Sequence, residues 1–278
     1  MIFTTFKDFL NEADHNKNFI NTAKDICQDE TKITNFIKWA KKHTGSKDLN
    51  ESDDTPIVEN IFELKFLIIL RANLNSQKSL YVGDINTSKL NSLEYLSGVS
   101  DNEGLHNEIK SLLKKHGFDD PKYYDTHTVF HRFEVTGIDK WDVSNVTNAH
   151  CAFEDVPYCL SLASWKPVKL EDAGCMFARS VCPMLGNRWG KAPIKDANVM
   201  FANCKEINES VTCLNLKHIV NCEHMFWGAT VEDGVDELDF SDWQEYVDKL
   251  SDKNKNDMFN FYNDKTKYKE VEPFVFKF

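Results

Sequence analysis

Apolar residues between Trp141 and Phe226 recur with a fixed period. Four phenylalanines stand 24, 24 and 25 residues apart, and three further columns keep the same register: a large apolar residue 12 positions earlier, an aliphatic residue seven earlier and a small residue four earlier. The phenylalanines are Phe153, Phe177, Phe201 and Phe226, and we number the repeats units one to four after them. A period of about 20–50 residues indicates stacked units, none of which buries its apolar face alone. We therefore expect phenylalanine to pack on phenylalanine along a shared core.

The spacing inside a unit predicts a strand, a corner and a short helix. In unit two, Leu170, Ala173 and Phe177 lie at i, i+3 and i+7, which places them on one helical face. The other units repeat this spacing. Upstream of Trp165, Leu160 and Leu162 alternate with a polar residue, as apolar residues do in a half-buried strand.

The first unit carries a family resemblance. The run Trp141–Asn148 (WDVSNVTN) resembles the repeat of BspA-like leucine-rich-repeat proteins and mycoplasma-type surface lipoproteins, and Leu238–Trp243 (LDFSDW) is similar to the strand of that repeat. The resemblance covers residues 134–243, although units two to four depart from the family's repeat sequence. It implies an α/β fold, a leucine-rich-repeat-like right-handed solenoid of about four strand–short-helix units, used to bind proteins. Known members are often secreted adhesins.

The flanking segments predict two helical ends. Residues 14–128 form a helical N-terminal region, residues 129–243 the BspA-like repeat solenoid and residues 244–278 a C-terminal helical cap. The expected helices before the repeats are Asn18–Cys27, Thr31–His43, Ile57–Asn73 with Pro56 at its start, Leu90–Leu96 and Leu105–His116. Leu80–Ile85 reads as a short strand or an extended loop, and Pro121–Thr128 as a bridge. Whether the N-terminal region is a cap for the repeats or an independent domain stays open, because solenoids need end units with a polar face.

Charge and the N-terminus restrict the class of partner. The net charge is −11, which disfavours nucleic acids and anionic membranes. The first residues lack the basic and apolar regions of a secretory signal, and the longest apolar run, Phe66–Leu70, is too short to span a bilayer. We therefore expect a cytoplasmic protein whose partner is another protein. Its oligomeric state stays open.

The eight cysteines predict buried free thiols. No C-x-x-C pair occurs, and Cys151, Cys175 and Cys222 fall in repeat columns near the core. A zinc site built on His218, Cys222 and His224 is the alternative, and burial of Cys222 argues against it. We predict no metal and no cofactor. The polar column Asn148, Asp172, Asp196 and Asn221 could form a calcium ladder, but local capping is the preferred interpretation.

Basic residues concentrate in units two and three. Repetition at 24 residues predicts one basic stripe that another protein could bind, although a solvated face that balances nearby acids would look the same. The candidate binding residues are Lys166, Lys169, Arg188, Lys191 and Lys195.

Catalytic motifs are missing from the sequence, so no catalytic residue is predicted. Residues 1–13 resemble the capsid-targeting peptide of T-even-type phage internal head proteins, with Glu12 and Ala13 at the implied cleavage site. The resemblance implies a detachable targeting peptide. We therefore predict a non-enzymatic protein-interaction module, packaged in a phage head. A cytosolic bacterial adaptor or adhesin-like protein without a virion link is the alternative, and an enzyme with its site in the N-terminal region is a third.

Overall fold

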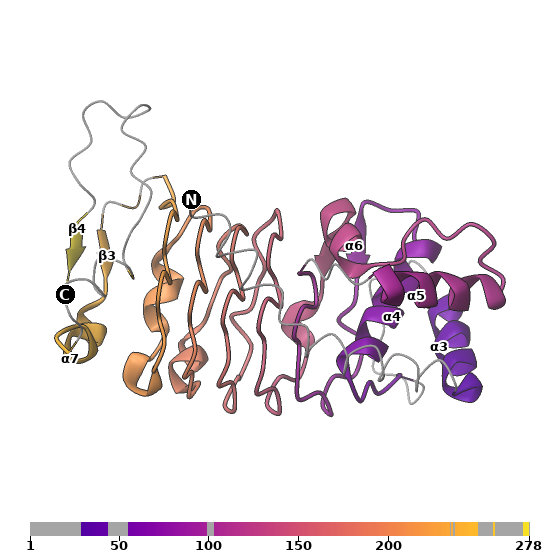
Figure 1. Cartoon of the computed structure of the whole chain (residues 1–278), viewed down its shortest axis with the longest axis horizontal. Coiled ribbons are helices and arrows are strands. Elements are labelled where there is room, and N and C mark those ends of the chain that lie inside the picture. Colours follow the sequence, from indigo (N-terminus) through magenta and orange to yellow (C-terminus); the bar gives the residue numbers. More distant parts are fainter. Residues whose placement is uncertain are drawn as a thin grey trace.

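The computed structural model describes residues 29–43, 55–98, 103–233, 235, 237–249, 258 and 275–277. These residues form an elongated molecule with helices at one end and stacked turns of chain in the middle (Figure 1). The other end holds α7 (Gln244–Val247) and the strands β3 (Glu237–Asp239) and β4 (Val275–Lys277), which pair in parallel. The predicted helix Asn18–Cys27 and the predicted cleavage site at Glu12 and Ala13 lie outside the described residues.

The helical end contains α3 (Glu30–Lys42), α4 (Ile61–Leu74), α5 (Glu103–Lys115) and α6 (Thr126–Arg132). The predicted helices Thr31–His43 and Leu105–His116 correspond to α3 and α5. The prediction that a helix starts at Pro56 is wrong, because Asn60 caps α4 by accepting a hydrogen bond from the Glu63 N–H at 3.0 Å. Ile57 instead pairs in parallel with Asn86. Helix α6 begins inside the segment predicted as a bridge.

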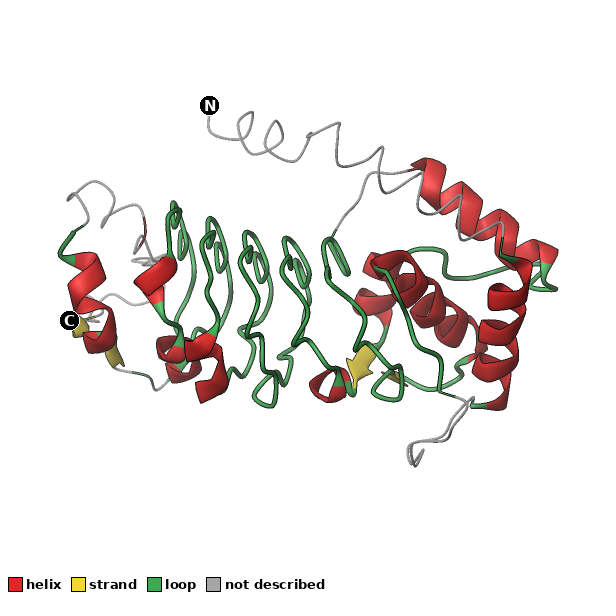
Figure 2. Cartoon of the chain, turned by 90° about the horizontal axis from the view of Figure 1, so that it is seen from below, coloured by secondary structure: helices red, strands yellow, loops and turns green. Residues whose placement is uncertain are grey.

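The middle of the molecule is held by parallel pairing between successive units (Figure 2). A row of isolated bridges joins Ser92 to Asn148, Asn148 to Asp172, Asp172 to Asp196 and Asp196 to Asn221. The strand predicted at Leu160–Leu162 is present only as one such bridge, between Ser161 and Met184. Short 3₁₀ helices η1 to η5 occupy the stretches Ile138–Lys140, Asn187–Lys191, Glu209–Cys213, Leu216–His218 and Ser241–Trp243.

The predicted short helix before each phenylalanine is wrong. Cys151, Cys175 and Val199 have positive φ angles of 52°, 54° and 60°, which an α-helix does not allow. The Cys151 N–H donates at 2.9 Å to the Gly174 carbonyl of the next unit rather than to its own unit. The helix-like spacing of small residues therefore arises from a tight bend, here called the tip of the unit, whose inward positions happen to recur every three or four residues.

The polar column at the start of each tip caps the bend. The side-chain oxygen of each member accepts a hydrogen bond from the backbone N–H two residues later, at 2.8–3.3 Å. The members are Asn148, Asp172, Asp196 and Asn221. The predicted local capping is confirmed, since this is the hydrogen bond by which Asx residues stabilise turns.

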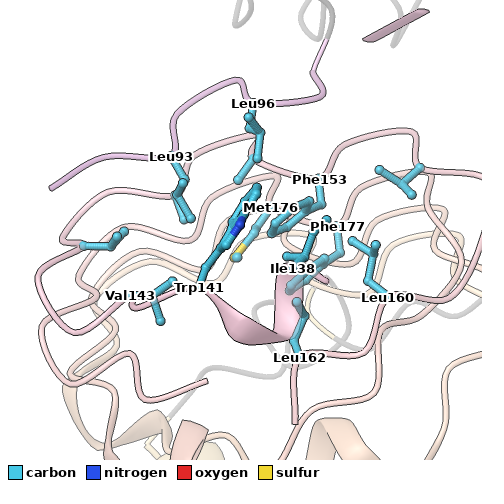
Figure 3. Packing of buried hydrophobic residues seen from close by; sticks show 14 of the residues in the cluster. Leu93, Leu96, Ile138, Trp141, Val143, Phe153, Leu160, Leu162, Met176 and Phe177 are labelled. Carbon is cyan, nitrogen blue, oxygen red and sulfur yellow. The ribbon is translucent and has the colours of Figure 1, made fainter. Parts of the chain in front are cut away.

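Residues 79–97 form an additional unit, here called the leading unit, ahead of unit one. The strand β1 (Ser79–Tyr81) pairs in parallel with β2 (Glu134–Thr136), and the Leu93 N–H donates to the Asn148 carbonyl at 2.8 Å. The helix predicted at Leu90–Leu96 is therefore wrong. Leu93 and Leu96 lie over Trp141 in the core (Figure 3), so α5 and α6 are an insertion between the leading unit and unit one.

Aromatic side chains stack through the whole row of units. Phe153 and Phe177 are 6.0 Å apart between ring centroids, Phe177 and Phe201 5.4 Å, and Phe201 and Phe226 5.3 Å. All four are at most 1% exposed, so the predicted packing of phenylalanine on phenylalanine is confirmed.

Tryptophans also fasten units one, two and three, each to the unit before it. The indole N–H of Trp165 donates to the Ile138 carbonyl at 2.8 Å, and that of Trp189 to the Leu162 carbonyl at 3.1 Å. Trp141 reaches Val82 of the leading unit in the same way at 2.9 Å. A buried indole N–H without an acceptor would cost about 1–3 kcal/mol, so these bonds help to set the register between units.

Candidate functional site

The five predicted binding residues are all exposed on units two and three. Each follows or precedes a buried anchor: Lys166 comes directly after Trp165, and Lys195 directly after Ile194. Because the anchors point into the stack, the neighbouring lysines are directed to solvent. The structure therefore presents these cations on the outer surface of the repeats, as a binding role requires.

Three of the cations contact the unit before their own. Lys169 Nζ donates to Asn145 Oδ1 at 2.7 Å, and Arg188 Nη1 donates to the Ser164 carbonyl at 3.4 Å. Lys195 Nζ lies 2.9 Å from Glu171 Oε2, with about half of each side chain exposed. An exposed pair of this kind contributes only about 0–1 kcal/mol, so it leaves Lys195 able to exchange partners.

The five cations lie in different columns of units two and three, whereas the prediction from the sequence is one basic stripe. Residues in one column lie 24 apart, and Lys169 shares its column with Asn145, Lys195 with Glu171, and Arg188 with Ser164. The five side chains thus occupy different columns, spread across two units. We call this surface the basic patch, defined by Lys166, Lys169, Arg188, Lys191 and Lys195. Lys166 and Lys191 take part in none of the ion pairs found among the described residues.

Two exposed apolar side chains border the cations and were missed in the sequence. Val168 is 47% exposed between Lys166 and Lys169, and Val220 is 84% exposed next to Lys195, to which its N–H donates at 2.7 Å. The sequence did contain a signal for Val220, because the residues at the same position in the other units, Thr147, Glu171 and Lys195, are polar. An exposed aliphatic side chain beside mobile cations offers apolar contact area to a partner.

The alternative zinc site at His218, Cys222 and His224 is not assembled. Cys222 is 7% exposed, and its Sγ lies 3.2 Å from the Tyr246 hydroxyl. Burial raises the pKa of Cys222, and its hydrogen bond with Tyr246 opposes this only in part. The His224 ring packs edge-on against Trp227. Among the residues described, these three do not form one of the groups whose donor atoms converge. The metal-donor atoms of two other groups of side chains do converge, and one of these groups contains Cys151.

The described helices are short for a lipid bilayer. The most apolar helix, α4, has 14 residues, and no helix in the described part of the chain is long and apolar enough to cross a membrane.

Comparison with known proteins finds a matching family. No curated protein and no solved structure matches the chain. The family described as "Mycoplasma protein of unknown function, DUF285" matches residues 122–239 and again residues 184–270. Together the two matches cover more than half of the 278 residues and include all four units. They support the coarser part of the resemblance, a mycoplasma-type family. This chain therefore belongs to the DUF285 family of Mycoplasma proteins of unknown function.

Proposed function

We propose that this chain is a non-enzymatic protein-interaction module, a leucine-rich-repeat-like right-handed solenoid whose basic patch binds another protein. The observation that carries the proposal is the surface of units two and three. There, five cations and Val168 are exposed on a chain whose net charge is −11. A local reversal of charge of this kind is what a docking surface for an acidic partner needs.

Electrostatics on this chain would select both partner and orientation. An acidic protein is repelled by most of the surface and attracted at the basic patch, which raises the association rate and excludes wrong orientations. Val168 and Val220 would then add apolar contact, since charge complementarity contributes more to rate and specificity than to affinity. The same net charge makes nucleic acids and anionic membranes poor partners.

The buried charges of the helical end support a scaffolding role for that region. Glu63 is 2% exposed and pairs with Lys32 at 2.6 Å, and it also accepts a hydrogen bond from the Glu59 N–H at 2.9 Å. Arg71 pairs with Asp84. These groups hold α3, α4 and the leading unit together, which is the task of a cap on a stack of repeats.

The proposal is tested by charge reversal. The variant Lys169→Glu/Arg188→Glu/Lys191→Glu should lose most of its binding to a partner captured by the wild-type chain and identified by mass spectrometry. Its remaining binding should depend less on salt, because fewer ionic contacts are left to be screened.

The matched control reverses three exposed lysines at the helical end, Lys78→Glu/Lys114→Glu/Lys122→Glu. It changes the net charge equally and should bind as the wild type does. Equal loss in both variants would show that only net charge matters. Unchanged binding in the repeat variant would remove the basic patch from the proposal.

A further inference from the structure

Two groups of metal-donor side chains converge among the described residues, and one of them is buried. The donor atoms of His150, Cys151 and Cys175 all lie within 4.8 Å of one another. Both cysteines are fully buried, and the His150 side chain is 19% exposed. Zinc ligands placed about 2.0–2.3 Å from the ion lie about 3.5–4 Å from one another, so these donors need only small shifts to close on a metal ion.

The repeat architecture brings these donors together. Cys151 and Cys175 hold the same position in neighbouring units, each with a positive φ that turns its side chain into the tip, and their thiols contact each other. Gly174 occupies the position of His150 in the next unit. A Cβ at Gly174 would meet His150 Nδ1 at 2.8 Å, so the missing side chain makes room for the imidazole.

A buried carboxylate, that of Glu154, lies next to Cys151 of this group. Gly98, Ala178 and Ala202 are small where unit one has Glu154, whose side chain is only 2% exposed. The carboxylate accepts a hydrogen bond from the Cys151 thiol, and its Oε1 is buried without a hydrogen bond of normal geometry, 3.0 Å from Arg179 Nη2. A buried carboxylate is costly unless it is paired or binds a metal, and here it is paired with Arg179, whose side chain is 35% exposed.

Neighbouring side chains enclose and orient the group. Asp172 Oδ1 lies 3.6 Å from His150 Nδ1, so a small shift would let this carboxylate accept a hydrogen bond from the imidazole and orient it as a metal ligand. The edge of the Tyr95 ring packs against His150 at 5.6 Å on the side of the leading unit. On the opposite side, Val199 holds the equivalent position in unit three and is 8% exposed.

We propose that Cys151, Cys175, His150 and Glu154 bind one zinc ion, or another divalent ion that prefers sulfur and nitrogen ligands. The charges of the four ligands, the ion and Arg179 balance when His150 binds as a neutral imidazole, and Asp172 lies outside this set. Two thiols release their protons and become thiolates, which with Glu154 carry three negative charges. The ion supplies two positive charges and Arg179 the third. The ion would cross-link the tips of units one and two from within, where the sequence predicts free thiols and no metal.

Cobalt is the sharpest probe, because a thiolate bound to Co²⁺ gives a charge-transfer absorption that histidine and carboxylate ligands do not give. The reduced, chelator-treated full chain should take up one equivalent of Co²⁺ with this absorption, and Zn²⁺ should displace it. Zinc should also raise the melting temperature, since it binds only the folded state. Cys151→Ser/Cys175→Ser should abolish both effects.

Two control variants separate this site from the rest of the chain. Cys182→Ser/Cys204→Ser removes another pair of buried thiols, and His127→Gln/His131→Gln removes the second, partly exposed donor group, which His127 and His131 form with Asp155. Both should keep the absorption. If the cysteine double variant fails to fold, Asp172→Asn serves instead and should weaken metal affinity by about 10–100-fold, because Asp172 is a positioning residue.

Three results would overturn the proposal. One is the absence of a thiolate–cobalt absorption in the wild type. Another is its persistence in Cys151→Ser/Cys175→Ser. The third is a Cys151–Cys175 disulfide in protein isolated under reducing conditions.

Discussion

At the residue scale, the stacked phenylalanines of the four units form a continuous part of the core. Phe177 is 1% exposed, stacks on Phe153 and Phe201, and also packs against Trp189 at 6.3 Å. The Phe177 ring therefore packs against both neighbouring units. Removing one ring takes apolar contact from both sides of a unit, and the short bends between units give the backbone little freedom to close the gap.

We expect Phe177→Ala to lower the free energy of unfolding by about 3–5 kcal/mol, the usual cost of truncating a buried phenylalanine. Urea denaturation measures this directly. The matched control is Val168→Ala in the same unit, which is 47% exposed and should change stability by no more than about 0.5 kcal/mol. A cost below about 1 kcal/mol for Phe177→Ala would mean that the stacked rings do not carry the core.

At the element scale, one buried ion pair joins α4 to the leading unit. Arg71 Nη2 lies 2.8 Å from Asp84 Oδ2, Arg71 Nη1 donates to the Tyr81 carbonyl at 2.7 Å, and the guanidinium lies 4.5 Å from the Trp39 ring of α3. The two charged side chains are 6% and 7% exposed. Arg71, which belongs to α4, therefore contacts both α3 and the leading unit.

Arg71→Met should cost about 3–5 kcal/mol in a urea titration, because it leaves Asp84 buried without its countercharge. The double variant Arg71→Met/Asp84→Leu should recover part of that loss, since no uncompensated charge then remains. Lys89→Met is the control: its pair with Glu59 is more than half exposed and contributes little. If Arg71→Met costs no more than Lys89→Met, the pair does not hold the cap to the stack.

At the scale of the whole molecule, the helical end and the repeats share one core. Trp141 of unit one is covered by Leu93 and Leu96 of the leading unit (Figure 3), and its indole N–H donates to Val82. A cut between residues 128 and 129, the boundary predicted from the sequence, would therefore separate surfaces that are buried against each other. The leading unit binds the two regions together.

A fragment of residues 134–278 should accordingly fail to melt cooperatively and should bind a dye that reports exposed apolar surface. Burial of each large apolar side chain contributes about 1.5–3 kcal/mol, and the fragment exposes several at once. A fragment of residues 55–278 keeps the leading unit and should retain a cooperative transition in circular dichroism. If the shorter fragment melts within a few degrees of the full chain, the repeats are an independent domain.

The sequence alone determined the period, the identity of the core columns and the helices α3 and α5. These features depend on which residues must be buried, and burial requires a regular spacing of apolar residues along the sequence. It also located the basic patch, because charge is visible without a structure. The 24-residue spacing also assigns the five cations to separate columns, whereas the contacts of three of them with the preceding unit required the structure.

Only the tertiary structure decided the shape of each tip, the leading unit and the buried donor group. Leu90, Leu93 and Leu96 have helical spacing, yet the N–H groups of Leu93, Tyr95 and Ser97 donate to carbonyls of unit one, which follows the inserted α5 and α6 in the chain. In the tips, positive φ angles and hydrogen bonds to the next unit replace the helix that the spacing favours. Periodicity records which side chains face inward. It does not show which distant backbone groups form hydrogen bonds with a given segment. Those hydrogen bonds hold the units in a stack and place Cys151 next to Cys175.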